Sequence, residues 1–444
     1  MYEISVIGLG FVGLPLLVSI SDKKKFLKNI IGIEVNNSSG KKKIKYIKDS
    51  KNDGLFLDNK LSKIFTKNKK SIIFSTNYKN ASNSDFIFFC FPLHITKNLN
   101  TNLNDYCDLI GKYCKIAKSG AIFIFNSTSP PGITSQIIKE LSKKKLIRDD
   151  VFFVFSPERV MPGLNYYESI VNSHRVFSSN SNLEVSKKVK KLFSIIFNTK
   201  KFQVTEFKKY EEAECTKILE NSYRAINIAL IEEWTILAEK FGIDLFSVIK
   251  AIRHRSTHSN IMKPGLGVGG YCLTKDPYFA KFTSHKFLKN KLNFPFVDLT
   301  MKINSKMHVR VTREINKMIH RDHKIKKILI AGISYAENVD DIRNSRSLDM
   351  VNDIVKKGKK LTIYDPVVKI LSYKKVKIIK KLKNLNEYDL IIFNVKHKQF
   401  EKIDFNTMTK NTYIVDTNNI LNENQIKDIL NKKIKLKIIG RGDI

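Results

Sequence analysis

The sequence predicts an α/β fold in which two doubly wound parallel sheets are joined by a helical segment. Short, nearly continuous apolar runs recur in the first and last parts of the chain, and such runs are typical of strands buried on both faces of a parallel sheet. Between them, Lys208 to about Gly242 reads as one long helix without internal Pro or Gly. At 444 residues, the chain is too long for a single hydrophobic core, so several domains are expected.

The first predicted strand, Ile4 to Ile7, runs into a Gly-x-Gly-x-x-Gly turn. Leu14 to Ile20 continues as a helix, and the next strand, Ile30 to Ile33, ends at Glu34. In this context the glycines allow a tight turn, and the helix N-terminus favours a pyrophosphate. The Glu34 carboxylate suits a ribose diol and disfavours a 2′-phosphate, which predicts NAD as the cofactor. The turn residues expected to contact it are Gly8, Gly10, Phe11, Val12 and Gly13.

Three more apolar runs extend the first sheet, and two polar turns follow strands of that sheet. The predicted strands are 71–75, 85–91 and 121–125, with a further strand at 151–155. The turns are Asn126 to Gly132, followed by a helix at 133–141, and Ser156 to Gly163. Ligands of open α/β sheets bind at such carboxyl ends.

The long helix places Lys217, Asn221 and Arg224 on one face, because residues three or four apart are neighbours on a helix. Side chains of this kind usually face solvent. Apolar residues on the rest of the helix instead suggest packing on most sides, and buried polar groups would then need partners. These apolar residues are Leu219, Ala225, Ile228, Ala229, Ile231 and Trp234.

The stretch from Gly265 to Asp276 combines four glycines with Cys272, Lys275 and a carboxylate. Glycines let a ligand approach the backbone closely, and a cysteine becomes nucleophilic when nearby cations stabilise its thiolate. The other interpretation is a surface turn followed by an inert, buried cysteine.

A second α/β region begins beyond Met301. Its predicted strands are 327–332, 360–366, 389–395, 413–416 and 437–440, with a helix at 347–357. Two α/β halves around a helical middle are the architecture that this order implies.

Composition restricts the functional classes. The net charge is +37, but the lysines are spread over nearly every segment without an aromatic-basic motif, so a nucleic-acid partner is not favoured. The five cysteines lack metal-ligand spacing, which predicts thiols in a reducing cytoplasm and no metal site. No apolar run is long enough to span a membrane.

Taken together, these motifs resemble the UDP-glucose/GDP-mannose dehydrogenase family over essentially the whole length. The resemblance rests on the glycine turn at Gly8, Ser127-Thr128 before Pro-Pro-Gly, Pro157 to Gly163, Lys217 with Asn221, Gly269-Gly270-Tyr271-Cys272 with Asp276, Asp340 to Ser345, and Gly440-Arg441-Gly442. It implies three domains: an NAD-binding Rossmann-like domain at 1–205, a central helical domain at 206–310, and a nucleotide-sugar-binding Rossmann-like domain at 311–444.

The resemblance also implies a reaction, the oxidation of a sugar C6 alcohol to a carboxylate with two NAD⁺. Cys272 would form a thiohemiacetal and then a thioester, while Lys217 and Asn221 would stabilise oxyanions. Thr128, Glu158 and Asp276 would position water and move protons. The implied cofactor contacts include Ser127, Thr128, Lys275 and Arg343; the implied substrate contacts are Glu158, Arg159, Lys217, Asn221, Arg224, Lys263, Gly269 and Gly270.

Four positions depart from the family pattern and bear on the substrate. Tyr271 precedes the cysteine where His is more common, Ala336 replaces a substrate-contacting lysine, and Cys90-Phe91-Pro92-Leu93 replaces Val-Pro-Thr-Pro. Pro162 stands where UDP-glucose-type members tend to have a second glutamate. This version resembles members that act on UDP-N-acetylhexosamines, with UDP-glucose or GDP-mannose as alternatives.

The expected protein is a cytoplasmic enzyme of polysaccharide biosynthesis that forms a homodimer through its central helices, as the resemblance implies. Two other readings stay open. In one, a two-electron hydroxy-acid dehydrogenase has a structural Cys272; in the other, the basic chain is a nucleic-acid-binding module.

Overall fold

The computed structural model describes every residue except 51–54, 94, 96–100, 162, 357, 370–372, 374–375 and 409–411. Pro162 of the Pro157 to Gly163 motif therefore lies outside the described residues. The chain divides into two compact units. The N-terminal unit contains Met1–Glu220 and Tyr278–Asn293, and the C-terminal unit contains Asn221–Pro277 and Phe294–Ile444.

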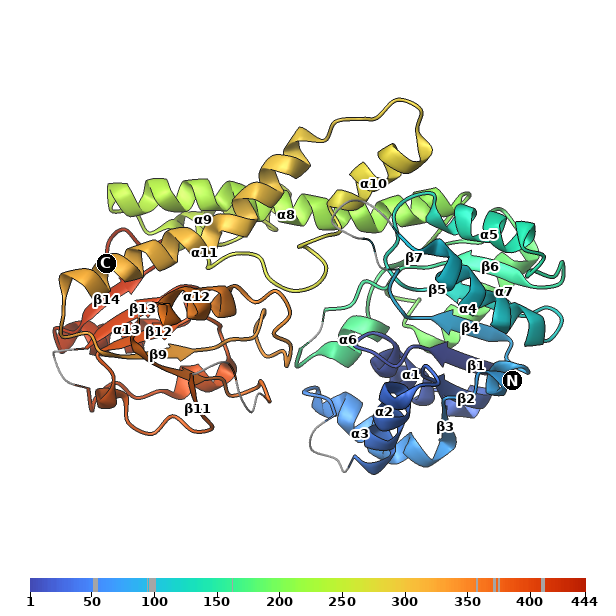
Figure 1. The fold of residues 1–444 in the computed structure, drawn as a ribbon, viewed down its shortest axis with the longest axis horizontal. Coiled ribbons are helices and arrows are strands. Elements are labelled where there is room, and N and C mark those ends of the chain that lie inside the picture. The colour runs from blue at the N-terminus through green and yellow to red at the C-terminus, as the bar shows by residue number, and fades with distance from the viewer. Residues whose placement is uncertain are drawn as a thin grey trace. The chain divides into compact units, whose positions relative to one another are not determined.

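The N-terminal unit is built on a sheet to which the described residues contribute eight strands (Figure 1). All neighbouring strands are parallel except one antiparallel pair, the sixth and seventh strands along the chain. In spatial order they are β3 (Ile72–Ser75), β2 (Leu27–Ile33), β1 (Tyr2–Ile7), β4 (Phe86–Phe89), β5 (Ile122–Phe125), β6 (Phe152–Phe155), β7 (Arg175–Ser178) and β8 (Val204–Phe207). Its helices are α1 (Gly13–Ser21), α2 (Ser38–Asp49), α3 (Asn59–Asn68), α4 (Leu103–Ile116), α5 (Ile133–Lys143), α6 (Tyr166–Val171), α7 (Leu183–Ile196) and α10 (Tyr278–Phe287).

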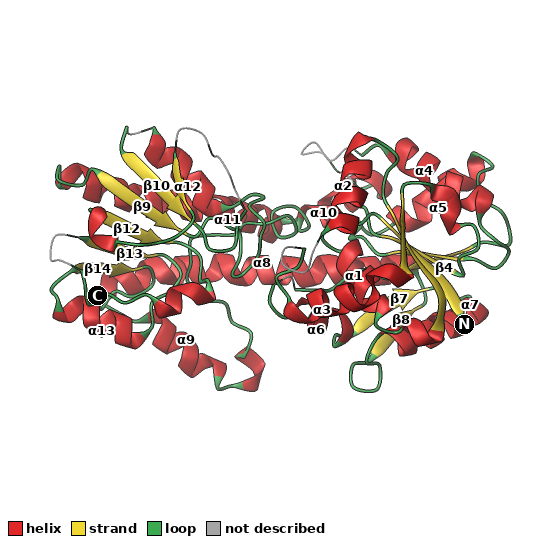
Figure 2. Ribbon diagram, turned by 90° about the horizontal axis from the view of Figure 1, so that it is seen from below, coloured by secondary structure: helices red, strands yellow, loops and turns green. Residues whose placement is uncertain are grey.

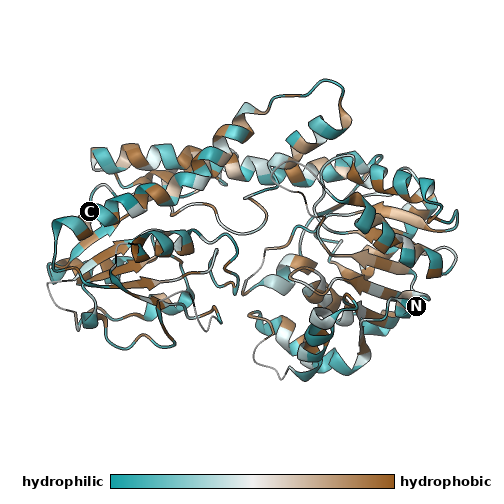
Figure 3. Ribbon diagram, in the orientation of Figure 1, coloured by the Kyte–Doolittle hydropathy of each residue, from teal (hydrophilic) through white to brown (hydrophobic). Residues whose placement is uncertain are grey.

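Both faces of this sheet are buried, which explains the continuous apolar runs. Along β4, Phe86 and Phe88 pack with α1, α3 and α7 on one face. Ile87 and Phe89 pack with α4 and α5 on the other. Because neighbouring side chains of a strand point to opposite faces, a strand covered on both sides needs apolar residues at every position. Figure 3 shows these strands in the colour of hydrophobic residues.

The C-terminal unit contains a second sheet, which is parallel throughout its six described strands. Its strands, in spatial order, are β11 (Lys377–Ile379), β10 (Lys360–Tyr364), β9 (Lys327–Ala331), β12 (Leu390–Phe393), β13 (Tyr413–Asp416) and β14 (Lys435–Ile438). Its helices are α9 (Leu245–Arg253), α11 (Pro295–Arg321), α12 (Arg346–Val355) and α13 (Glu423–Asn431). Figure 2 shows that each sheet is accompanied by helices. The predicted fold class, with two Rossmann-like parallel sheets and a helical middle, is confirmed.

Helix α8 (Tyr210–Phe241) is the long predicted helix, and residues from it belong to both units. Within a single chain, the expectation that it is packed on most sides is wrong. Leu219 is 67% exposed and Trp234 is 53% exposed, whereas Ala225 and Ala229 are buried. The apolar residues lie all around the helix, so their pattern does not identify the covered face, and small alanines allow the closest packing there.

The last predicted strand also differs from the structure. It ends at Ile438 rather than continuing to Gly440. Gly440 has a φ of 86°, and a Cβ there would lie 2.6 Å from a ring carbon of Pro264. The glycine therefore forms a turn that a strand residue would not adopt.

Within the described part of the chain, no helix combines the length and apolar character needed to cross a bilayer. The same described residues contain no group of three His, Cys, Asp or Glu side chains arranged to hold a metal ion.

Candidate active site

The glycine turn between β1 and α1 has the close packing that its sequence predicts. Gly8 has a φ of 88°, and its N–H donates to the Ile33 carbonyl over 2.8 Å. A Cβ on Gly13 would lie only 2.0 Å from the Gly8 carbonyl oxygen. Helix α1 therefore begins directly against the turn, and its N-terminus is available to a phosphate group.

Glu34 follows β2 and places its carboxylate beside this turn. It accepts hydrogen bonds from the Leu9 N–H over 3.1 Å and from Lys43 Nζ over 2.7 Å. Lys43, from α2, is a neighbour that the sequence pattern did not indicate. The side chain of Glu34 is only 11% exposed. A glycine turn with an adjacent carboxylate fits the pyrophosphate and ribose of NAD.

The two predicted polar turns lie at neighbouring strand ends, because β5 and β6 are paired. Asn126 connects them: its side-chain amide donates to the Ser156 carbonyl over 2.8 Å, and its own carbonyl accepts the Glu158 N–H over 3.0 Å. Ser127 and Thr128 are half-buried, while Glu158 is buried. The structure thus brings Thr128 and Glu158 to the carboxyl ends of two neighbouring strands of the N-terminal sheet.

Glu158 forms a buried ion pair with Arg175 of β7, a residue that the sequence analysis missed. The Arg175 Nη2 to Glu158 Oε1 distance is 3.0 Å, and the two side chains are 3% and 5% exposed. The guanidinium also lies 3.7 Å from the centroid of the Phe197 ring. Burial and the Glu158 charge raise the pKa of the neighbouring Cys90 thiol. The available signal was a charged residue directly before the apolar pair Val176-Phe177 of a short strand.

The start of α8 is anchored to the N-terminal sheet by its acidic residues. Glu214 is fully buried and accepts hydrogen bonds from the Gly132 and Thr134 N–H groups over 2.7 and 2.9 Å. Burial raises the pKa of Glu214 to about 7. Glu220 forms an ion pair with Arg159, with 2.6 Å between Glu220 Oε1 and Arg159 Nη2. Lys217 lies between these two anchors on α8 and is half-buried.

In the C-terminal unit, Cys272 lies in a turn that is closed by its own backbone. The N–H groups of Lys275 and Asp276 both donate to the Cys272 carbonyl, over 3.0 and 2.8 Å, and the cysteine itself is exposed. The alternative interpretation placed this cysteine in a buried position, and that burial is contradicted by the structure. An exposed thiol in a tight turn is accessible to an aldehyde.

Asp276 connects two other predicted site residues, Lys275 and Asn221. Its side chain is 0% exposed. It accepts hydrogen bonds from Lys275 Nζ and from the Asn221 side-chain amide, each over 2.7 Å. Asn221 is itself buried on α8, so the predicted need for a polar partner is met. The carboxylate fixes the amide orientation of Asn221 and keeps a cation beside the cysteine turn.

Gly269 and Gly270 pack against the segment that carries Arg343. A Cβ on Gly269 would lie 2.9 Å from the Asn344 carbonyl oxygen. The Gly270 N–H donates to the Arg343 carbonyl over 3.1 Å. Arg343 binds Asp341 through its Nε and Nη2. This hydrogen-bonded carboxylate is the main cause that raises the pKa of the guanidinium, with smaller contributions from Tyr335 and Cys272.

The remaining predicted residues are more peripheral in the structure. Burial raises the pKa of the Tyr335 phenol to about 12. Arg224 is exposed, and its positive charge lowers this pKa by a smaller amount. Lys263 is exposed, and Ala336 accepts a hydrogen bond from Ser334 Oγ through its carbonyl. Thr128, Glu158 and Lys217 belong to the N-terminal unit, whereas Cys272, Asn221 and Asp276 belong to the C-terminal unit.

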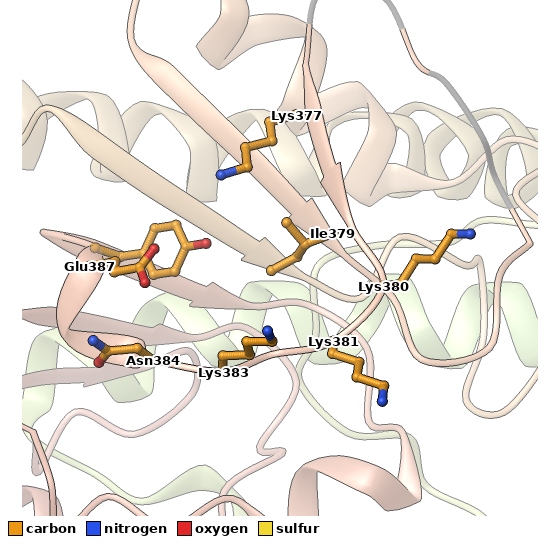
Figure 4. A pocket seen from close by; sticks show the side chains of 8 residues that line it. Lys377, Ile379, Lys380, Lys381, Lys383, Asn384 and Glu387 are labelled. Carbon is orange, nitrogen blue, oxygen red and sulfur yellow. The ribbon is translucent and has the colours of Figure 1, made fainter.

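A cavity of about 410 Å³ lies beside β11 and is lined by lysines (Figure 4). The lysines are Lys377, Lys380, Lys381 and Lys383. β11 lies at the edge of the C-terminal sheet, two strands away from β9. Ligands of doubly wound sheets bind where the strand order reverses, so this cavity is not part of the candidate site.

Comparison with known proteins identifies the family. The sequence matches three domains of the UDP-glucose/GDP-mannose dehydrogenase family: the NAD binding domain at residues 2–197, the central domain at 211–306 and the UDP binding domain at 329–423. It is 30% identical to the UDP-N-acetyl-D-mannosamine dehydrogenase of Methanocaldococcus jannaschii, over 99% of this chain and 97% of that protein. The chain belongs to the UDP-glucose/GDP-mannose dehydrogenase family.

Other relatives of this dehydrogenase agree with that assignment. It is 27% identical to the UDP-N-acetyl-D-glucosamine 6-dehydrogenase of Pseudomonas aeruginosa, over 82% of this chain and 83% of that protein. Its fold resembles the UDP-D-ManNAc dehydrogenase of Pyrococcus horikoshii, with a TM-score of 0.79, 24% identity and full coverage of both chains. The protein is an NAD-dependent nucleotide-sugar dehydrogenase.

Proposed function

We propose that this dehydrogenase oxidises the C6 alcohol of a UDP-N-acetylhexosamine to the uronic acid in two steps, through a covalent adduct on Cys272. The observation that carries this proposal is the exposed Cys272 in its closed turn, next to the buried Asp276 that holds Lys275 and Asn221. The substrate class is supported by the relatives, which are named for UDP-N-acetylmannosamine and UDP-N-acetylglucosamine.

The nucleophile is needed for the second oxidation. NAD⁺, when bound, accepts one hydride from the alcohol and one from the covalent adduct. An aldehyde carbon must first gain a bond to sulfur. The resulting thiohemiacetal carbon is tetrahedral, and its oxygen can re-form a carbonyl as the hydrogen leaves as hydride, which gives the thioester. The Cys272 thiolate attacks this carbon, and the carbonyl oxygen becomes an oxyanion that accepts a proton or a hydrogen bond. Water then cleaves the thioester, which returns the thiol and releases the carboxylate.

Each remaining site residue has a role that follows from its chemistry. Lys217 and Asn221 would donate hydrogen bonds to the oxyanions, one charge-assisted and one neutral. Asp276 holds the Asn221 amide in place, with 2.7 Å between them. Thr128 and Glu158, at one edge of the N-terminal sheet, would orient water and receive its proton. Ser127, Lys275 and Arg343 are proposed to contact NAD. Arg159, Arg224, Lys263, Gly269 and Gly270 are proposed to contact the nucleotide sugar.

The decisive experiment is a count of NADH per molecule of substrate. UDP-N-acetylmannosamine, UDP-N-acetylglucosamine, UDP-glucose and GDP-mannose are each incubated with excess NAD⁺, and the product is identified by mass spectrometry. We expect two NADH and a uronic acid from an N-acetylhexosamine substrate. A ratio of one NADH, or turnover of a simple hydroxy acid instead, would show a two-electron dehydrogenase.

The variant Cys272→Ala tests the role of the thiol. It should abolish acid formation and leave the dissociation constant of NAD within about twofold, because the glycine turn and Glu34 are untouched. Cys215→Ala is the matched control, because Cys215 is the other exposed cysteine and is proposed to have no role. Wild-type turnover by Cys272→Ala would remove the cysteine from the mechanism.

The assembly and setting are part of the same proposal. We infer a homodimer that forms through α8, where Leu230, Trp234, Leu237 and Phe241 are exposed apolar side chains. All five cysteines are thiols, which supports a reducing cytoplasm. The uronic acid product suits the synthesis of a surface polysaccharide.

A further inference from the structure

Two cationic side chains meet at the ring of Tyr271, the residue that precedes Cys272. Lys275 Nζ lies 4.5 Å from the centroid of the ring. The guanidinium carbon of Arg343 lies 5.4 Å from the same centroid. Both distances are within the range in which the negative face of an aromatic ring attracts a cation. The three residues all belong to the C-terminal unit.

The backbone around Tyr271 is held in place from both sides. Asn344 donates its side-chain amide to the Gly270 carbonyl over 3.0 Å, and Thr274 Oγ1 donates to the same carbonyl over 2.8 Å. Gly270 has a φ of 81°, and a Cβ there would lie 2.7 Å from the Tyr335 ring. Tyr271 is half-buried. The backbone from which the ring extends is thus held by neighbouring segments.

The carboxylates of the site do not by themselves bring the two cations together. Lys275 is paired with Asp276 at 2.7 Å, and Arg343 is paired with Asp341 at 2.6 Å. Those carboxylates belong to different segments, and two like charges repel each other. A neutral aromatic ring that attracts both cations offsets this repulsion. A histidine at this position would add a positive charge whenever it was protonated.

The charge of Arg343 acts on the thiol. Both cationic residues lie against the cysteine turn: the Lys275 N–H donates to the Cys272 carbonyl over 3.0 Å, and the Arg343 carbonyl accepts the Gly270 N–H over 3.1 Å. Asp341 is the main cause of the raised pKa of Arg343, and Cys272 is a smaller one. Because an electrostatic interaction is mutual, the guanidinium favours the thiolate form of the cysteine. A cation held in place therefore makes Cys272 more nucleophilic, whereas a cation that moves into solvent does not.

We propose that Tyr271 is a positioning residue that holds Lys275 and Arg343 beside Cys272 and so keeps the thiol reactive. This inference rests on the proposed function, because it assigns Tyr271 to the support of the nucleophile. Tyr271 attracts the two cations through the face of its ring. Its hydroxyl group does not contribute to this positioning.

The test measures the alkylation rate of Cys272 by iodoacetamide, without substrate or NAD. The background variant Cys215→Ser removes the other exposed thiol, and peptide mass spectrometry locates the adduct. In this background, Tyr271→Leu should react about 3- to 10-fold more slowly at pH 7, as expected from the loss of one or two cation–ring contacts. Tyr271→Phe keeps the ring and should stay within about twofold of the background.

The alkylation rate is measured a second time at about pH 10.5, where an ordinary thiol is fully ionised. This measurement separates an effect on the thiolate fraction of Cys272 from an effect on the access of iodoacetamide to the sulfur. There the Tyr271→Leu and Tyr271→Phe rates should agree. Equal rates at pH 7 would overturn the proposal, and so would a Tyr271→Leu variant that is slow at both pH values, because that pattern indicates a blocked or distorted turn. Circular dichroism spectra of the variants check that they are folded.

The outcome is distinct from that of the proposed function. A parent enzyme that makes one NADH per substrate would refute the covalent mechanism and leave the alkylation result unchanged. A parent that makes two NADH, with Tyr271→Leu alkylated at the rate of Tyr271→Phe, would refute only the role of the ring.

Discussion

Among the described residues, the ion pair between Arg175 and Glu158 is the most deeply buried charge pair close to the proposed catalytic residues. Its side chains are 3% and 5% exposed, and Arg175 also donates to the Ile170 carbonyl over 2.7 Å. Burying both charges is costly, and the pair is tolerated because each charge compensates the other. The pair thereby fixes the position of the Glu158 side chain at the carboxyl end of β6.

Removal of one partner should be much more harmful than removal of both. Arg175→Met leaves the Glu158 carboxylate buried without its cation, and we expect a loss of about 3–5 kcal/mol in the free energy of unfolding. The double variant Arg175→Met/Glu158→Leu should recover most of that loss. Urea unfolding followed by far-ultraviolet circular dichroism measures both, since the one tryptophan, Trp234, lies in the C-terminal unit. Equal losses in the single and double variants would contradict this account.

The comparison of Cys272 with Arg175 shows which site residues a sequence reveals. Cys272 and Asp276 lie in a glycine-rich turn, and Lys217 and Asn221 are one helical turn apart, so their residue types and spacing are visible in the chain. Arg175 acts through a contact with Glu158 that joins separate loops and strands. Such a contact depends on strand order, which a local pattern does not encode. Lys43 beside Glu34 was missed for the same reason.

At the scale of elements, a buried carboxylate of α8 joins that helix to the start of α5. Gly132 is the N-cap of α5 and has a φ of 94°, so it has no side chain to satisfy the first N–H groups of the helix. Glu214 of α8 supplies that acceptor and also binds Thr134 Oγ1 over 2.6 Å. The turn that carries Ser127 and Thr128 immediately precedes this N-cap. Glu214 therefore fixes the proposed water-positioning turn relative to the first part of α8, which carries Lys217.

Glu214 should make stability depend on pH. Burial raises its pKa from 4.5 to about 7, so between these values the folded protein binds a proton that the unfolded chain has released. The free energy of unfolding therefore decreases as the pH rises from about 4.5 to 7. Glu214→Gln cannot ionise and should lose this contribution, which is on the order of 3 kcal/mol over the window. Urea unfolding at several pH values gives the difference between the two proteins.

Glu211→Gln is the control for this prediction. Glu211 lies on the same helix and accepts a hydrogen bond from Ser135 over 2.5 Å, but it is only half-buried. Its variant should retain most of the wild-type pH dependence, because burial is the main cause of the raised pKa of Glu214 and the Glu211 charge is a minor one. If Glu214→Gln and the wild type showed the same slope between pH 4.5 and 7, the buried carboxylate would not be the titrating group.

The strands differ in how well their patterns predicted them. β4 and β5 are wholly buried and consist only of apolar residues, so their continuous runs were recognisable. β8 is Val-Thr-Glu-Phe and partly exposed, and β11 has only three residues. Both lie at sheet edges, where polar side chains are accommodated and the apolar signal is weak. Edge strands depend on pairing with a neighbour more than on their own sequence.

The two sheets use the acid after their second strand in different ways. Glu34 follows β2 and faces the glycine turn, as described above. Asp365 follows β10, and its Oδ2 accepts the N–H groups of Ile333 and Ser334 over 2.7 and 3.2 Å and lies 3.2 Å from His397 Nε2. The Asp365 carboxylate is therefore occupied by hydrogen bonds within the loops at that strand end, and these bonds fix the loop conformation. This difference agrees with NAD binding by the first domain and UDP binding by the last.

At the scale of the whole molecule, the high net charge makes association of two copies dependent on apolar contact. The charge of +37 is distributed along the chain and repels a second copy at long range, although physiological salt screens this repulsion beyond about 8 Å. Apolar side chains that lie exposed along one helix provide the opposing driving force. On α8 they recur at helical spacing, at Tyr223, Leu230, Trp234, Leu237 and Phe241.

This stripe predicts a homodimer that charged substitutions should dissociate. The double variant Trp234→Glu/Leu237→Glu places two carboxylates in the proposed contact, where they would be desolvated without a cation. Sedimentation equilibrium at micromolar concentration should show twice the chain mass of 51.2 kDa for the wild type and a single chain for the variant. A stable dimer typically buries about 1,200–2,000 Å², so the loss of two central apolar side chains is expected to raise the dissociation constant by at least about 100-fold.

Leu183→Glu is the matched control, because Leu183 is an apolar residue that is 76% exposed on α7 and does not belong to the stripe. That variant should remain dimeric, which would show that the effect of Trp234→Glu/Leu237→Glu is specific to α8 and does not come from added negative charge. A wild-type protein that sediments as a single chain would refute the dimer. If the double variant remained dimeric, the dimer interface would lie outside the stripe on α8. That exposed stripe would then have to be covered by something other than a second copy.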